Sequence, residues 1–84
     1  MDRNLEKLRM VKAVHEAALM SKANVVSVAI GLRQRGGVFT SEPAIVVSVT
    51  HKIPRSELSP EDVIPNTLGG VPVDVQAVGE IQAL

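Results

Sequence analysis

Residues 54–78, PRSELSPEDVIPNTLGGVPVDVQAV, determine much of the expected fold of this chain. The prolines of this run restrict the backbone and exclude a long helix. The Gly69-Gly70 pair permits a tight reversal, and the alternation Val71-Pro72-Val73-Asp74-Val75 directly after it is typical of a strand. The run contains almost no reactive side chains. It therefore specifies shape rather than chemistry.

A one-turn helix is expected just before this strand. Ser59 is placed to cap the helix, Pro60 fits the first helical position, and Asp62 can complete a capping box. Pro65 then ends the helix after about one turn. The strand that follows covers residues 70–78, and the proline within it must face an edge or a bulge, because proline has no N–H to donate.

The rest of the chain supplies one long helix and two further strands. Residues 2–22 have the period of an amphipathic helix, and residues 25–33 and 44–50 alternate with the period of strands. Gly36-Gly37 lies between these two strands, in a hairpin that we expect to end in a long, mobile tip. The expected apolar stripe of the helix consists of Leu5, Leu8, Val11, Val14, Ala18 and Leu19.

These elements predict an α+β fold. One long N-terminal amphipathic helix packs on a small, three-stranded, mainly antiparallel sheet, and the one-turn helix precedes the last strand. The 84 residues are expected to form a single domain, 1–84, because a chain this short has apolar surface for only one core.

Composition excludes several classes of function. The nine basic residues equal the nine acidic ones, and Phe39 is the only aromatic residue, so a nucleic-acid-binding face is not expected. No apolar run approaches the roughly 18 residues that cross a membrane. The charged N-terminus does not resemble a signal peptide, which leaves the location open and favours the cytoplasm. The lack of cysteine also excludes a disulfide framework and a thiolate metal site.

Neither histidine lies in a pattern that indicates catalysis or metal binding. His15 falls within the helical stripe, where a core-edge position explains it, and His51 ends a strand, where it is solvated. The glycines and arginines of residues 31–37 lead to another strand rather than to a helix N-terminus, so they do not predict a phosphate-binding loop. We therefore expect no catalytic residue, no metal site and no cofactor.

One helix covers only one face of the sheet, so the other face is either solvated or a docking surface. The expected open face shows Val25, Ala29, Ala44, Val46 and Val78 beside Ser27, Ser48 and Thr50. Near the hairpin tip, Arg33 and Arg35 form a small basic patch, and Phe39 either covers the core or anchors a partner. The candidate protein-contact residues are Val25, Ala29, Val46, Ser48, Arg33, Arg35 and Phe39.

Several short motifs occur in the order seen in a known family. They are the turn Arg35-Gly36-Gly37, the strand Glu42–Val47, the exit Lys52-Ile53-Pro54, Pro60-Glu61-Asp62 with Ile64-Pro65, and Gly70–Val75. Over residues 24–79 the chain resembles a small domain that precedes the catalytic domain of some bacterial trypsin-like serine peptidases. The resemblance implies that such a catalytic domain would follow Leu84, and it transfers no catalytic residue. The chain is then either an excised domain or a free-standing relative.

The leading hypothesis is a non-catalytic accessory domain that scaffolds, masks or assembles a peptidase through protein contact. Its partner is then a downstream peptidase domain or another protein. Self-assembly into a homo-oligomer is an alternative, because zero net charge and a Val-rich open face favour it. A second alternative is a small hydrolase or ligand-binding enzyme that uses His15, His51, Arg33 and Arg35. Neither nucleic acid nor a membrane is an expected partner.

Overall fold

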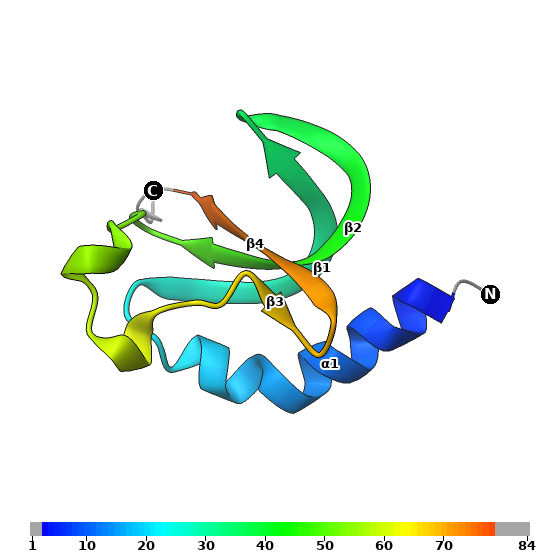
Figure 1. Cartoon of the computed structure of the whole chain (residues 1–84), viewed down its shortest axis with the longest axis horizontal. Helices are drawn as coiled ribbons and strands as arrows, with labels where there is room; N and C mark the ends of the chain where they lie inside the picture. Colours follow the sequence, from blue (N-terminus) through cyan, green and yellow to red (C-terminus); the bar gives the residue numbers. More distant parts are fainter. Residues whose placement is uncertain (1–2, 79–84) are drawn as a thin grey trace, which may run out of the picture.

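The computed structural model of the chain describes residues 3–78 and has an α+β fold, as expected (Figure 1). A long helix is followed by a hairpin, an irregular segment with two single 3-10 turns, and a last pair of strands. The elements are α1 (Arg3–Met20), β1 (Val25–Arg35), β2 (Val38–Val49), η1 (Arg55–Glu57), η2 (Pro60–Asp62), β3 (Thr67–Leu68) and β4 (Val71–Ala77).

The sheet is four-stranded and mixed, which corrects the expected three-stranded, mainly antiparallel sheet. Its strand order is β1-β2-β4-β3, in which β1 and β3 pair antiparallel with their neighbours and β2 pairs parallel with β4. The long connection from Val49 to Val71 allows the parallel pairing, because it carries the chain back to the starting end of β2. Strand β3 has only two residues, too few to show an alternating pattern.

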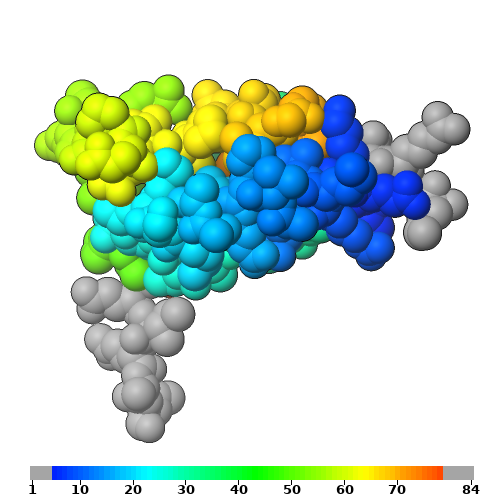
Figure 2. All heavy atoms as spheres, turned by 90° about the horizontal axis from the view of Figure 1, so that it is seen from below, coloured from blue at the N-terminus to red at the C-terminus, as the bar shows by residue number. Residues whose placement is uncertain are grey.

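The core lies between α1 and the sheet, with α1 covering one face (Figure 2). Leu8, at 2% exposure, and Leu19 pack from α1 against Ile45 and Val47 of the central strand β2. The helical stripe is narrower than expected, since Val14 is 76% exposed. At 3.6 residues per turn, Val14 is rotated by about 120° from Leu8 and therefore faces away from the sheet. Ala18 is exposed as well.

The β1–β2 hairpin has a two-residue turn, so the prediction of a long tip is wrong. Gly36 and Gly37 have φ angles of 58° and 79°, the left-handed conformation that glycine adopts without steric cost. The ladder continues to the turn, with Gln34 opposite Phe39 and Arg35 opposite Val38.

Two irregularities bend this hairpin. The register shifts between Val25 and Ser27, where β1 holds one extra residue, and again between Leu32 and Gln34, where β2 holds the extra residues. The first shift turns Val25 toward the core, against which it packs. The second lies where the hairpin curls back over the sheet in Figure 1.

The curled hairpin covers part of the face that we expected to be open, although Ala29 on that face stays exposed. The backbone N–H of Gln34 donates to Asp74 Oδ2 (2.8 Å), and Gln76 Nε2 donates to the carbonyl of Leu32 (3.1 Å) and to Asp74 Oδ2 (2.9 Å). These bonds, which we call the polar latch, join β1 to β4 across the concave side of the hairpin. Val46 on that side is only 8% exposed. The prediction that this valine forms an open docking face is wrong.

The segment before β4 forms single 3-10 turns rather than a capped one-turn α-helix. Ser59 makes no side-chain cap, and the predicted capping box is absent. Asp62 Oδ1 instead accepts a hydrogen bond from the backbone N–H of Ala23 (2.9 Å), and Lys22 Nζ donates to the carbonyl of Glu61 (2.6 Å). Asp62 thus connects this segment to the turn after α1.

Candidate protein-contact surfaces

An apolar patch lies on the convex side of the hairpin, beyond the reach of α1. We define the tip patch as Leu32, Phe39 and Pro43. Leu32 lies opposite Pro43, and Phe39 lies opposite Gln34, two residues from Leu32 on β1, so the three side chains share one face. Leu32 is 45% exposed, Phe39 is 62% exposed, and Pro43 is also exposed. Phe39 therefore does not cover the core, and its exposure leaves it free to anchor a partner.

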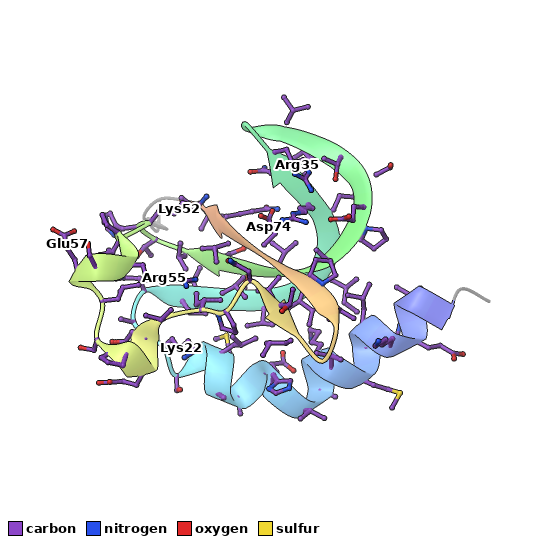
Figure 3. All side chains as sticks on the ribbon, viewed as in Figure 1. Lys22, Arg35, Lys52, Arg55, Glu57 and Asp74 are labelled. Atoms are coloured by element: carbon purple, nitrogen blue, oxygen red, sulfur yellow. The ribbon has the colours of Figure 1, made fainter. Side chains whose placement is uncertain are left out.

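The two arginines of the hairpin lie on the opposite, concave face. Arg33 Nη1 forms a 2.9 Å ion pair with Glu42 Oε1, and the carbonyl of Arg33 accepts a hydrogen bond from Thr40 Oγ1 (2.9 Å). Figure 3 shows Arg35 on the inner side of the curve, above Asp74. The structure thus brings Arg33, Arg35 and Phe39 to one end of the hairpin but places the arginines and Phe39 on different faces.

The polar latch holds the hairpin, and therefore the tip patch, in its bent position. Replacing Asp74 by alanine removes the acceptor for Gln34 N–H and one partner of Gln76, and we expect it to lower the free energy of unfolding by about 2 kcal/mol. Glu42→Ala is the matched control on the same hairpin, because it removes only an exposed ion pair worth about 0–1 kcal/mol. Urea unfolding of both variants measures the difference, and equal losses would show that the latch does not hold the hairpin.

A cleft of about 210 Å³ lies between residues 51–66 and the ends of β2 and β4. Its inner wall is apolar and includes Val49 and Val75, and its exposed rim includes Lys52 and Arg55. Arg55 lies on the sheet side of η1, and Glu57 lies on the outer side (Figure 3). The wall and rim would suit an apolar group with a polar or acidic end.

The two histidines lie on different elements. His15 is half-buried on α1, and His51 is exposed just after β2, where its Nδ1 is 3.1 Å from Thr50 Oγ1. Within residues 3–78, no group of three or more histidine and acidic side chains could hold a metal ion. Within residues 3–78, no helix combines the length and the apolar character needed to cross a membrane.

The comparison with protein families decides the classification. The family model described as the NARROW LEAF 1 N-terminal domain matches residues 2–78. The chain belongs to this family. The match includes α1, the whole sheet and the tip patch, so every surface described above lies within the family domain. No curated protein sequence matches the chain significantly.

Membership of the NARROW LEAF 1 N-terminal domain family corrects the resemblance to domains of bacterial trypsin-like serine peptidases, which is wrong. The motifs behind that resemblance have structural roles here. The Arg35-Gly36-Gly37 motif forms the hairpin turn, Glu42–Val47 is a segment of the central strand, and Gly70–Val75 begins β4. These motifs therefore account for turns and strands of the fold.

The remaining predicted contact residues do not form one surface in this family domain. Val25 is half-buried against the core, because the extra residue in β1 turns it inward, and Val46 is buried by the curled hairpin. Ala29 is exposed on β1, and Ser48 is half-buried on β2. The predicted sheet-face site is thus divided, and Ala29 alone of these four is exposed.

Leu32 and Pro43 were missing from the predicted contact residues. In the alternation of residues 25–33, Leu32 falls on the side opposite Ala29. This is the core-facing side in the structure, but Leu32 lies past the end of α1 and is exposed. A length comparison could have found this: an 11-residue strand spans about 36 Å, whereas an 18-residue helix spans about 27 Å. The end of the hairpin must then extend past the helix.

Proposed function

We propose that this domain is a non-catalytic protein-contact module and that the tip patch is the surface through which it binds a partner. The observation that carries the proposal is the exposure of Phe39, the only aromatic residue, at the end of an ordered hairpin. Aromatic side chains that are fixed before binding lose little conformational entropy in a complex, which makes them frequent anchors of protein interfaces. Leu32 and Pro43 extend the apolar surface around Phe39.

The hairpin presents this surface rigidly. The glycine turn, the Arg33–Glu42 ion pair and the polar latch fix the positions of the strands on both sides of Phe39. The family description refers to an N-terminal domain, which supports contact with another part of the same polypeptide. A contact of this kind can scaffold, mask or assemble that part of the protein.

Site-specific photo-cross-linking tests the proposal. A photoreactive phenylalanine analogue at position 39 is expected to form a defined protein adduct in cells that express the natural gene, and mass spectrometry separates adducts within the polypeptide from adducts with other proteins. The same analogue at Ser56, an exposed position on η1, is the control and is expected to give no defined adduct. Identical patterns at the two positions would contradict a binding role for the tip patch.

A substitution separates binding from stability. Phe39→Ser is expected to remove the interaction while changing the free energy of unfolding by less than about 0.5 kcal/mol, because exposed side chains contribute little to folding. Unfolding by urea and the cross-linking yield at a second exposed position, Val38, are measured for the variant. A large loss of stability would show that Phe39 acts in the fold rather than in a contact.

A further inference from the structure

Strand β1 has a free edge within the described part of the chain. It is the first strand in the order β1-β2-β4-β3, so one of its edges pairs with β2 and the other with no strand. The carbonyl of Arg33 accepts from Thr40 of β2, whereas Leu32 and Gln34 direct their backbone groups away from β2, to the side chains of Gln76 and Asp74. Because backbone groups alternate along an antiparallel strand, Val28 and Ile30 also direct their N–H and C=O groups to the outer edge.

Between the bulge at Val25–Ser27 and the polar latch at Leu32, the outer edge carries none of the features that usually prevent strand pairing. From Ser27 to Leu32 the strand contains no proline and no charged residue, and its pairing with β2 is regular. Natural proteins protect exposed edges with lysine, proline, bulges or a covering segment. The opposite edge of the sheet is protected in this way, since β3 covers the start of β4 and Pro72 lies in β4. By contrast, the β1 edge is left unprotected over this stretch.

A groove runs along this edge. Val28, Ala29 and Ile30 of β1 line it on one side, and the other side is formed by four residues of α1. These residues are Arg9, Lys12, Ala13 and Glu16. The groove has a basic residue at one end and an acidic residue at the other, on a chain with no net charge.

We propose that the occupant of this edge is a second copy of the same chain, paired antiparallel through β1. A two-fold axis at Ala29 places Val28 of each copy opposite Ile30 of the other, with the outward backbone groups of both residues facing one another. The two sheets then form one continuous sheet. Ala29 is small and exposed, so its side chain does not obstruct the axis.

The same two-fold axis brings oppositely charged side chains of the two α1 helices close together. The groove is centred on Ala29 in β1 and between Lys12 and Ala13 in α1, so the axis relates residue 9 of one helix to residue 16 of the other. Arg9 of each copy therefore lies near Glu16 of the other, at both ends of the helix pair. Glu16 already accepts an ion pair from Lys12 of its own chain (3.0 Å), which also offsets the charge of Lys12 near the axis.

The spacing of the two helices is compatible with this arrangement. Paired strands lie about 4.8 Å apart, and α1 packs over both β1 and β2. A helix axis above the line between β1 and β2 is then about 5 Å from the two-fold axis, and the two helices are about 10 Å apart. This distance lies at the upper end of the usual separation of packed helices.

Sedimentation equilibrium of the purified 84-residue chain over a wide concentration range tests the proposal. We expect a reversible dimer with a mass near twice the 8.9 kDa of the chain. Ala29→Lys places two like charges at the axis and is expected to raise the dimer dissociation constant at least about tenfold. Ala18→Lys, the same change at an exposed position on the side of α1 opposite the groove, is the matched control and leaves the constant unchanged. Thermal melting checks that both variants fold.

A charge exchange tests the helix pair independently. Arg9→Glu and Glu16→Arg are each expected to weaken the dimer, and the double exchange restores it, because the two residues pair only between copies. A chain that stays monomeric at millimolar concentration would overturn the proposal, as would equal dissociation constants for Ala29→Lys and Ala18→Lys. A dimer disrupted by Phe39→Ser but not by Ala29→Lys would also overturn it, and would assign self-association to the tip patch.

Discussion

Replacing Leu8 by alanine is expected to lower the free energy of unfolding by about 3 kcal/mol, which is the largest effect of a single core truncation that we predict. Leu8 is 2% exposed and packs between α1 and the sheet, and its removal leaves a cavity in the part of the core that joins them. Small domains have a total stability on the order of 5 kcal/mol. The variant should therefore be partly unfolded at room temperature.

Val14→Ala is the matched control for this prediction. Valine 14 belongs to the helical stripe that the sequence predicts, yet it is 76% exposed, so its truncation should change the stability by less than about 0.5 kcal/mol. Far-UV circular dichroism during urea unfolding is the suitable measurement, because the chain has no tryptophan or tyrosine for fluorescence. Similar losses for Leu8→Ala and Val14→Ala would mean that α1 packs on the sheet through a wider face than the structure shows.

The helix and the hairpin could be predicted from the sequence because local patterns encode them. The apolar period of residues 2–22 corresponds to α1, and the Gly36-Gly37 pair forms the turn between β1 and β2. The width of the buried stripe could not be predicted in the same way. The width depends on the rotation of α1 about its own axis where it packs on the sheet. The alanines and valines around α1 are compatible with several such rotations.

The parallel neighbour of β4 could not be read from the sequence. Residues 44–50 and 70–78 show the same Val-rich alternation whichever strand lies beside them, and the choice between parallel and antiparallel pairing is made by the path of the 21-residue connection. The register shifts in the hairpin could not be predicted either, because they depend on which residues of β1 and β2 pair with each other. They determine that Val25 faces the core and that Val46 is buried, two results that simple alternation predicts incorrectly.

The candidate contacts were predictable in part. Phe39 was identified by its residue type, but its exposure follows from the length of the hairpin relative to α1. The β1 edge could not be identified at all, since the order of strands decides which of them lies at an edge. The tip patch and the β1 edge are separate surfaces, so a domain in this family could bind one partner at each of them at the same time.

Replacing Gly69 by alanine is expected to lower the free energy of unfolding by about 3 kcal/mol, through two physical effects that can be separated. Gly69 has a φ angle of 54°, and a non-glycine residue in this region costs about 1–2 kcal/mol. A Cβ at this position would also lie 2.9 Å from Cγ2 of Val11, closer than such atoms approach in proteins. The β3–β4 turn and α1 would have to move apart, which disturbs the packing of both elements.

Gly37→Ala isolates the first effect. Gly37 has a φ angle of 79° and no neighbour within 4 Å of an added Cβ. The free energy of unfolding of this variant should therefore fall only by the conformational cost, about 1–2 kcal/mol. Val11→Ala isolates the second, because it removes the methyl group that an alanine at position 69 would meet. In urea unfolding, the Val11→Ala and Gly69→Ala double variant should therefore be more stable than the sum of the single losses predicts. If the losses are additive, the close approach of the turn to α1 is not what requires glycine, and the left-handed backbone alone does.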